Sequence, residues 1–386
     1  MSDTRSIKVA VASSGLGHIS RGIETWANDL GIALHQRGVN VTLFKGGGQS
    51  QQPFERVVRC WQRDRSRTKL LTKLCVRGGW RFGLGSAYQI EQTSFARRLI
   101  PQLRTGRFDV VHMQDPWVAW LLERARRSGR HQSQVILAHG TEEPFEFLQQ
   151  FTHLQELAPY YLENDQRAGL DGKHWYAIPN FVNVDQFSPN GSPLSRASLG
   201  ISEDAFVILT VAAIKRTHKR VHVAIDETVR LRATHPNCNI HLVVAGAKER
   251  ETEEVIAFGR EQLGAAVTFL PNFDRERMPE IYRMANVLAH AALVEMMPIA
   301  LLEATASGLP VVAHQWPVIQ WIVGAGGTCV NAEQPGQLAQ ALGSYLDENQ
   351  RQTRAAAARA RAVALFSEEV VLKQILRMYE DVLSKR

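Results

Sequence analysis

The strongest constraint on the fold of this chain is the alternation of short apolar segments with stretches that carry apolar residues at helical spacing. The first apolar segment, 7–12, precedes a small-residue loop and then Ile23, Trp26, Leu30 and Leu34, which would share one face of a helix. Further strand-like segments are expected at 39–44, 110–113, 135–138 and 176–178, and then at 207–212, 240–245, 267–270, 287–290 and 311–313. This alternation is typical of parallel βαβ units. We therefore predict two doubly wound α/β domains in tandem.

A break between the two series of strands sets the expected domain bounds. The first series stops at Pro179-Asn180, and the Pro-, Ser- and Gly-rich stretch 188–193 is typical of a linker. A chain of 386 residues is long enough for two domains of roughly 150 to 200 residues. We expect a first domain at 1–187, a second at 188–366, and a C-terminal helix at 367–386 that packs back on the first.

The positive charge of the chain is local. The formal net charge is +7, but residues 55–82 hold nine basic and only two acidic side chains, so the remainder sums to zero. A nucleic-acid binder would carry basic residues over a whole face, so nucleic acid is not an expected partner. The four cysteines lie far apart with no C-x-x-C pair, which favours a reducing compartment.

The chain start and the apolar runs bear on localisation. The first residues lack the apolar core of about 7 to 15 residues that a signal peptide needs, and no apolar run reaches the ~18 residues of a membrane span. We expect a cytoplasmic protein, with peripheral membrane contact left open.

Gly15 and Gly17 follow the first expected strand and open a helix, where backbone N–H groups and the helix dipole favour phosphate. A dinucleotide site would place a third glycine at Ser20 and an acidic residue where the second strand ends, but Lys45 stands there. The pattern argues against NAD. It leaves open a structural turn or a generic phosphate or diphosphate contact.

Two glutamates flank the start of a predicted helix in the second domain. Pro298 suits the first helical position, so the helix should run from there to about Ser307. Glu295 would then lie just outside the positive helix end, and Glu303 about 7.5 Å along the axis. In isolation this pattern is more often a capping acid and a solvated helical glutamate. The chain contains no D-x-D and no ligand-spaced His, Cys and Asp cluster, so we expect no metal and no cofactor.

Several segments together resemble a known family. Residues 295–312 are similar to the E-x7-E segment of the retaining glycosyltransferases of family 4, two-domain enzymes whose GT-B fold sets two Rossmann-like domains across a cleft. The other matching segments are 14–24 (glycine loop and helix), 108–112 ("DVVH"), 137–140 ("HG"), 179–187 ("PNGVD…F"), and 267–270 with 282–286 ("V-F-LG…Y-ADV"). The resemblance covers nearly the whole chain.

The resemblance implies a role for each matching residue. It makes the first domain the acceptor side and the second the donor-nucleotide side. Glu303 would hold the donor ribose, Glu295 the donor sugar, and Lys219 the diphosphate, while His139 would contact the sugar or stabilise the transition state. The implied catalytic residues are His139, Glu295 and Lys219, and the donor-binding residues are Gly15, Gly17, Lys215, Arg216, Lys219, Leu270, Met296, Met297, Pro298 and Glu303.

The chain departs from the family pattern at three places. Met296-Met297 replace a Gly-Phe pair beside the donor sugar, Ala213 replaces an arginine of the diphosphate site, and Asn180-Phe181 lack a glycine. Lys215 and Arg216 are the candidates to replace that arginine. The donor is therefore inferred only from how often each donor occurs in the family, which puts UDP-hexose first and GDP-mannose second.

The implied function is a retaining, metal-independent transfer of a hexose from a nucleoside-diphosphate sugar to a hydroxyl of a glycan, glycolipid or small molecule. The alternatives are a sugar-nucleotide-binding protein with little transferase activity and an epimerase or hydrolase on the same fold. The basic segment falls on the acceptor side, with Arg63, Arg65, Arg67 and Trp80 as its candidate residues. It would hold an anionic acceptor, contact an anionic membrane, or be a solvated loop.

Overall fold

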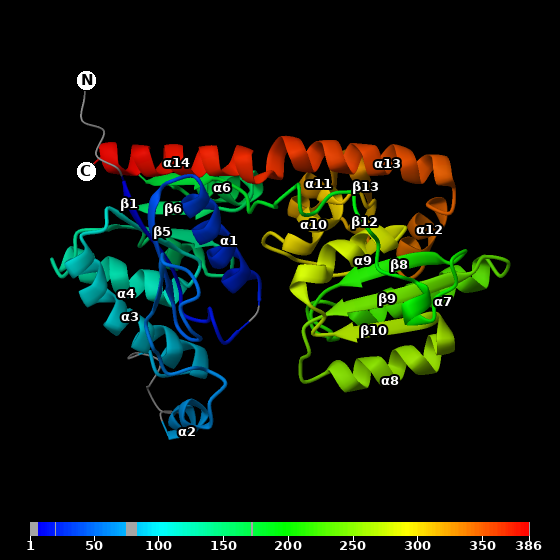
Figure 1. Cartoon of the computed structure of the whole chain (residues 1–386), viewed down its shortest axis with the longest axis horizontal. Coiled ribbons are helices and arrows are strands. Elements are labelled where there is room, and N and C mark those ends of the chain that lie inside the picture. The colour runs from blue at the N-terminus through cyan, green and yellow to red at the C-terminus, as the bar shows by residue number, and fades with distance from the viewer. Residues whose placement is uncertain (1–6, 20, 75–82, 171–172, 386) are drawn as a thin grey trace. The chain divides into compact units, whose positions relative to one another are not determined.

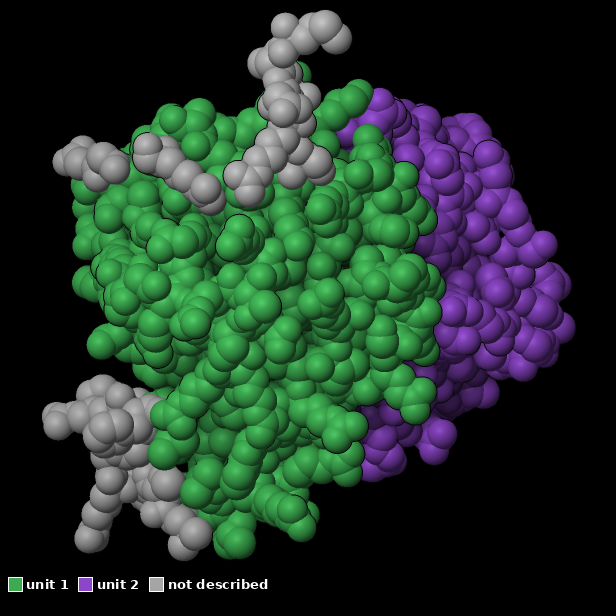
Figure 2. Space-filling view, turned by 60° about the vertical axis from the view of Figure 1, so that its left-hand side comes forward, with its two compact units in different colours: residues 1–179, 372–386 green, residues 180–371 purple. Residues whose placement is uncertain are grey.

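The computed structural model describes residues 7–19, 21–74, 83–170 and 173–385. The chain divides into two compact units, residues 1–179 with 372–386 (unit 1) and residues 180–371 (unit 2), which Figure 2 shows in green and purple. Each unit is built around a parallel sheet, as the alternating pattern predicts.

Unit 1 holds a seven-stranded sheet in the order β3-β2-β1-β4-β5-β6-β7. Its strands are β1 (Lys8–Ser13), β2 (Asn40–Lys45), β3 (Glu55–Val57), β4 (Val110–Met113), β5 (Gln134–His139), β6 (His153–Glu156) and β7 (His174–Ala177). Its helices are α1 (Gly22–Gln36), α2 (Ser66–Leu74), α3 (Ala87–Gly106), α4 (Pro116–Arg127), α5 (Phe145–Leu148), α6 (Pro159–Arg167) and most of α14 (Glu368–Ser384) (Figure 1). The strand order reverses between β1 and β4, and such reversals are where open parallel sheets bind ligands.

The central strand of unit 1 is buried on both faces. Val9, Ala10, Val11 and Ala12 are fully buried, and Val9 is in register with residues of both β2 and β4. A strand covered by helices on both faces must be apolar throughout, which is why this segment has no alternating pattern.

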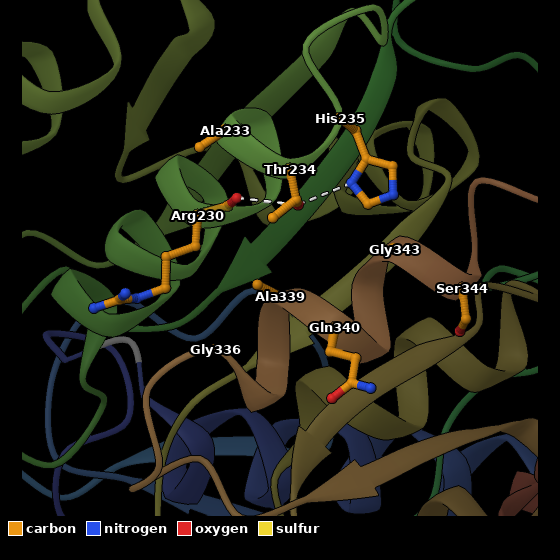
Figure 3. Close-up of a pocket in the computed structure, with 9 residues that line it drawn as sticks. All are labelled: Arg230, Ala233, Thr234, His235, Gly336, Ala339, Gln340, Gly343 and Ser344. Carbon is orange, nitrogen blue, oxygen red and sulfur yellow. Dashed lines mark hydrogen bonds between the residues drawn. The ribbon is translucent and has the colours of Figure 1, made fainter.

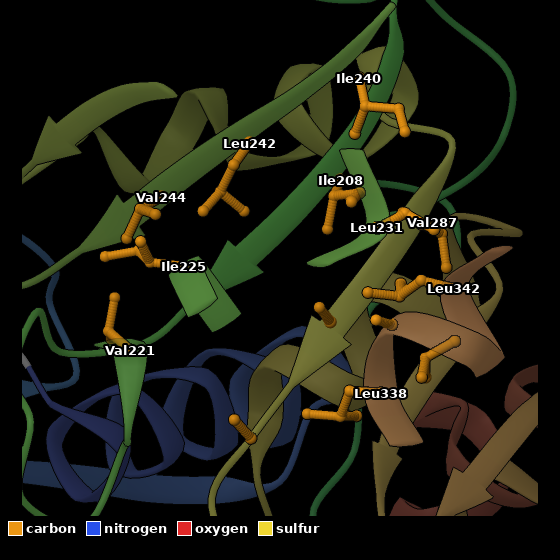
Figure 4. Close-up of a cluster of buried hydrophobic side chains, with 14 of the residues drawn as sticks. Ile208, Val221, Ile225, Leu231, Ile240, Leu242, Val244, Val287, Leu338 and Leu342 are labelled. Carbon is orange, nitrogen blue, oxygen red and sulfur yellow. The ribbon is translucent and has the colours of Figure 1, made fainter. Parts of the chain in front are cut away.

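Unit 2 holds a six-stranded sheet in the order β10-β9-β8-β11-β12-β13. Its strands are β8 (Phe206–Val211), β9 (Ile240–Gly246), β10 (Val267–Pro271), β11 (Val287–His290), β12 (Val311–His314) and β13 (Gly327–Val330). Its helices are α7 (Val221–Thr234), α8 (Thr252–Leu263), α9 (Met278–Met284), α10 (Ile299–Ala306), α11 (Pro317–Val323), α12 (Gln337–Ser344) and α13 (Glu348–Arg361). Branched side chains of β8, β9 and β11 meet those of α7 and α12 in one buried cluster (Figure 4).

The predicted fold class, two parallel doubly wound sheets, is confirmed. Three short strands were not expected from the sequence: β3, β6 and β13. Of these, β6 has the sequence His-Leu-Gln-Glu, and all four of its residues are buried.

The C-terminal helix α14 contributes polar contacts to unit 1. The Tyr379 hydroxyl lies 2.8 Å from Nδ1 of His112, and both side chains are fully buried. The Tyr176 hydroxyl also donates to the Asp381 carboxylate. These bonds connect the last helix to strands β4 and β7.

Candidate active site

Glu295 follows β11 and precedes α10, and three potentially cationic side chains surround its carboxylate. Lys219 Nζ donates a hydrogen bond to Oε1 of Glu295. The same oxygen lies 3.4 Å from Nε2 of His290 and 3.8 Å from Nε2 of His218. Trp316 fixes the backbone there, because its indole N–H donates to the Glu295 carbonyl oxygen at 3.1 Å. Glu295 is therefore held in place from both its side chain and its backbone.

The charge on Glu295 is stabilised despite its burial. Burial by itself raises the pKa of this carboxyl, but the neighbouring imidazoles of His218 and His290 and the charge of Lys219 outweigh that effect and hold the pKa well below its usual range. Glu295 is ionised at neutral pH, and the site contains a buried, charge-balanced pair.

The loop that carries Lys219 has an unusual backbone. His218 and Arg220, on either side of Lys219, have φ of 61° and 50°, the left-handed region that side chains other than glycine rarely adopt. Glu251 holds the loop from outside, because its carboxylate accepts from the Thr217 hydroxyl at 2.7 Å. Strained residues of this kind cluster at ligand sites, where the surrounding structure compensates for the strain.

Arg216, a candidate replacement for the missing arginine, is directed toward α8. Its Nε lies 3.1 Å from the Glu254 carboxylate, and its guanidinium stacks 4.6 Å from the centre of the Phe258 ring. Lys215, the other candidate, is half-buried in the same loop. The structure thus places Lys219 beside Glu295 and directs Arg216 elsewhere.

Glu303 lies in α10 with both carboxylate oxygens engaged. Oε1 accepts from Arg275 at 2.8 Å, and Oε2 accepts from the buried Tyr282 hydroxyl at 2.8 Å. Glu303 is 2% exposed, whereas the Arg275 side chain is 42% exposed. A ligand hydroxyl that reaches Oε1 would therefore replace a partly exposed arginine, while Tyr282 keeps the carboxylate oriented.

The other predicted donor residues surround the start of α10 and the end of β10. Met297 is buried and its carbonyl oxygen accepts from the Asn180 amide at 3.2 Å, while Met296 is half-buried. Pro298 caps the helix, which begins at Ile299, one residue later than predicted. Leu270 is half-buried in β10.

In unit 1, His139 is the last residue of β5. Its Nδ1 lies 2.9 Å from Oε1 of Glu156, at the end of the neighbouring strand β6, and its Nε2 lies 3.6 Å from Oε2 of Glu143. Burial lowers the pKa of His139, but the hydrogen bond and charge of Glu156 outweigh burial and raise the pKa above its ordinary value.

Both glycines of the first loop have packing roles. A Cβ on Gly15 would lie 2.0 Å from the Glu24 carboxylate, and one on Gly17 would lie 2.2 Å from the Gly47 carbonyl oxygen. Gly17 also has a φ of 94°. A structural turn accounts for both glycines, and a phosphate contact at this loop stays a prediction.

Arg63 belongs to a buried ionic network. Its guanidinium contacts Glu91 at 2.6 Å and Glu24 at 3.4 Å, and stacks on Tyr88. Arg65 is exposed just before α2, and Arg67 is exposed in its first turn. Trp80, the fourth residue predicted for the acceptor side, lies outside the described residues.

A hollow of about 680 Å³ lies between α7 and α12 of unit 2 (Figure 3). It is lined by Arg230, Ala233, Thr234, His235, Gly336, Ala339, Gln340, Gly343 and Ser344. In the described part of the chain, the residues predicted to bind the donor do not line this hollow.

The described ranges contain neither a candidate metal site nor a candidate membrane span. No group of three or more His, Cys, Asp and Glu side chains within them is arranged to hold a metal ion. No helix within the same ranges is both long enough and apolar enough to cross a bilayer.

Two parallel doubly wound sheets, one in each unit, are the architecture of the GT-B class of glycosyltransferases. Residues 20–186 match the sequence model described as Glycosyltransferase Family 4, and residues 192–362 match that described as Glycosyl transferases group 1. The chain belongs to this family of glycosyltransferases, as the sequence motifs predict.

Similar proteins extend the comparison. A D-inositol 3-phosphate glycosyltransferase of Acidothermus cellulolyticus is 30% identical over 219 residues, which cover 54% of this chain and 48% of that protein. The chain spans about half the length of the curated relatives it matches. The solved sucrose-phosphate synthase of Thermosynechococcus elongatus has a TM-score of 0.79 at 19% identity and covers 98% of this chain and 100% of its own. Anabaena HepE, solved with UDP and glucose, has a TM-score of 0.73 at 14% identity, with 97% and 100% covered. These structural likenesses show the fold.

Proposed function

We propose that this chain is a retaining, metal-independent glycosyltransferase that moves a hexose from a nucleoside-diphosphate sugar to an acceptor hydroxyl. The observation that carries the proposal is the Lys219–Glu295 pair beside the start of α10, with the fixed carboxylate of Glu303 farther along the same helix. This arrangement puts a cation and two carboxylates, which we propose bind the donor sugar and the donor ribose, on adjoining segments of one unit.

Lys219 would exchange its partner when the donor binds. Its side chain is a compact cation on a flexible stem, so it can leave Glu295 for a diphosphate oxygen without moving the backbone. Glu295 then keeps His218 and His290 as neighbours and is available to a donor sugar hydroxyl. Charge that develops on the departing diphosphate is stabilised by Lys219 and by the N–H groups at the start of α10.

The transfer we propose is a front-face substitution. The bond from the anomeric carbon to the diphosphate oxygen breaks, and a bond from that carbon to the acceptor oxygen forms on the same face. The acceptor hydroxyl proton passes to the departing phosphate oxygen, so the products are the glycoside and the nucleoside diphosphate. The step needs no metal ion and no protein nucleophile.

The names of the similar proteins support a sugar-nucleotide donor. One solved relative is titled a UDP-forming trehalose-phosphate synthase, and HepE was solved with UDP-glucose. We propose UDP-hexose as donor, with GDP-mannose second. For the acceptor we propose a sugar, lipid or small-molecule hydroxyl, and the names of the inositol-phosphate and sucrose-phosphate enzymes favour an acceptor that carries an anionic group.

The exposed part of the basic segment supports contact with an anionic lipid surface as the way to a lipid acceptor. The exposed cations Arg67, Lys69 and Lys73 accompany Leu70, which is 59% exposed, on α2, and Trp61 is 45% exposed just before it. Co-sedimentation with anionic and neutral vesicles at low and high salt tests this contact. Salt-sensitive binding to the anionic vesicles alone is expected, and no binding to either kind refutes it.

Substitution of the two central residues tests the proposed function. Lys219→Ala should lower kcat by about 10²- to 10³-fold, because a preorganised charge contact with the leaving group is lost. Glu303→Ala should lower kcat/KM for the donor by about 10- to 100-fold. Glu280→Ala, which removes a half-buried carboxylate of α9 that pairs with Arg277, is the control and should leave both unchanged. Full turnover of sugar nucleotides by both active-site variants would refute the proposal.

A sugar-nucleotide-binding protein with little catalysis is the second candidate, favoured by Ala213 and by the Met296-Met297 pair beside Glu295. Release of free nucleoside diphosphate in the absence of acceptor separates the two. Slow release supports the enzyme, whereas tight binding without release supports the binding protein. Interconversion of donor sugars without release would identify an epimerase.

A further inference from the structure

The contact between His139 and Glu156 joins the ends of two neighbouring strands. These two residues are direct partners in the register of β5 and β6, so their Cα atoms lie side by side. Nδ1 of His139 is 2.9 Å from one Glu156 oxygen and 3.1 Å from the other. Glu156 is fully buried and His139 is 6% exposed. The geometry leaves the imidazole ring little freedom to rotate.

The contact also determines which ring nitrogen is available. Because a carboxylate only accepts hydrogen bonds, Nδ1 must carry the proton that it donates to Glu156. Nε2 is buried and makes no hydrogen bond within the described residues. Nε2 is therefore the nitrogen that remains for a ligand, at the strand ends where parallel sheets bind their substrates.

Two further acids and one aromatic ring face the pair. Glu143, from the segment after β5, lies 3.6 Å from Nε2, and the Tyr161 ring of α6 meets the imidazole edge-on at 6.4 Å. Burial and the charge of Glu156 raise the pKa of Asp165, also on α6, to about 7. Below that pKa, a protonated Asp165 can donate a hydrogen bond to the Glu156 carboxylate.

We propose that Glu156 is a positioning residue for the transfer reaction: it fixes the imidazole of His139 so that a protonated Nε2 donates a hydrogen bond to an oxygen of a substrate bound at unit 1. This inference rests on the proposed function. It adds a residue from a strand that carries no motif of the family, and it assigns the role to the charge of Glu156 as well as to its shape.

The direction of the pH dependence follows from the charges. The Glu156 carboxylate favours the imidazolium form of His139, and burial opposes it. Activity that needs the Nε2 proton is present below the pKa of His139 and is lost as the pH rises through that value. Removing the Glu156 charge lowers this pKa, so the loss should occur at a lower pH.

Glu156→Gln tests the proposal, because glutamine keeps the shape and a hydrogen-bond acceptor but has no charge. The basic limb of the pH profile of kcat should lie at least one pH unit lower than in the unsubstituted protein, so kcat at pH 8 falls about tenfold or more. KM for the donor should change little. Glu156→Asp restores the charge and should move the limb back.

Glu55→Gln is the matched control. Glu55 is another buried carboxylate of unit 1, paired with Lys45 at 3.1 Å on the far side of the sheet, so its loss lowers stability without touching His139. It should leave the pH profile unshifted. A Glu156→Gln profile that coincides with the unsubstituted one, or a shift of equal size in Glu55→Gln, overturns the proposal.

An NMR titration of the histidine ring nitrogens gives a readout independent of turnover, with His139→Asn to assign the signal. It should show the Nδ1–H form of His139 at high pH in the unsubstituted protein, and protonation of the ring at a lower pH in Glu156→Gln. An unchanged protonation midpoint in Glu156→Gln overturns the inference. If the unsubstituted protein turns over no sugar nucleotide, it is the proposed function that fails, whatever the tautomer.

Discussion

The Tyr282→Phe substitution should show how much the stability of unit 2 depends on the hydrogen bond that orients Glu303. The substitution removes one hydroxyl and keeps the ring, which packs edge-on against Phe187. Tyr282 is 1% exposed, so water does not replace the lost donor, and Oε2 of an almost fully buried carboxylate loses its 2.8 Å partner. A hydrogen bond to a charged group contributes about 1.5–3 kcal/mol, and we expect a loss of stability in that range.

Tyr345→Phe is a matched comparison in the same unit. Tyr345 is fully buried and its hydroxyl lies 2.9 Å from the Thr328 hydroxyl, so the partner is neutral. A neutral pair contributes about 0.5–1.5 kcal/mol, about half the expected loss for Tyr282. Any difference between the variants then measures the charge of Glu303, because ring size and burial are alike.

Native-state hydrogen exchange is the suitable assay, because a protein of two units need not unfold in one step. The slowest amides of β8 and β11 report the opening of unit 2. A greater loss of protection in Tyr282→Phe than in Tyr345→Phe is expected, together with a raised KM for the donor. Equal losses would mean that Glu303 has no special need of this hydroxyl, and the reasoning would be refuted.

Three further predictions concern unit 1. Burial raises the pKa of Asp115 to about 7, so the folded chain keeps a proton that the unfolded chain releases near pH 4, and the free energy of unfolding falls as the pH rises between these values. Asp115→Asn should remove this fall, which amounts to up to about 4 kcal/mol at pH 8. Urea unfolding at pH 4 and pH 8 measures it, and parallel pH profiles of the variant and the parent would contradict the prediction. Gly17→Ala should lower the free energy of unfolding by about 2–4 kcal/mol, because Gly17 has a positive φ and a Cβ there would lie 2.2 Å from a carbonyl oxygen. Gly38→Ala, where φ is 74° and a Cβ would have no atom within 4 Å, should lower it by only about 1 kcal/mol, and equal melting temperatures of the two variants would contradict this. Tyr379→Phe removes the hydroxyl that lies 2.8 Å from Nδ1 of buried His112 and should lower the free energy of unfolding by about 1–3 kcal/mol. Faster hydrogen exchange of the β4 amides would show this loss, and unchanged protection of those amides would contradict it.

Apolar strands were predictable because hydrophobic pattern reports burial directly. The segments 110–113 and 287–290 coincide with β4 and β11. Strand β6 was not predicted, because a buried strand made of His, Leu, Gln and Glu lacks the apolar run that marks one. Its burial depends on partners supplied by β5 and β7, and those are set by topology.

In the candidate site, too, some residues could be predicted from the sequence and others could not. The family resemblance indicated Glu295, Glu303 and Lys219 as candidate site residues, whereas the partners that orient their side chains were not predicted. Tyr282 lies 21 residues before Glu303, and this pairing follows from how α9 and α10 pack. His290 had a usable signal, since it ends a predicted strand at the edge where ligands bind. Glu156 had none, because its own strand was not recognised.

The return of α14 to unit 1 makes unit 2 an insertion between two parts of the other unit. Residues 372–386 complete unit 1, so the ribosome has made all of 180–371 before the partner of His112 emerges. Unit 2 can therefore fold during synthesis, while unit 1 waits for the last helix. During that interval Nδ1 of His112 in β4 lacks its Tyr379 partner, and we expect a chain shortened before Tyr379 to leave unit 1, not unit 2, open to proteases.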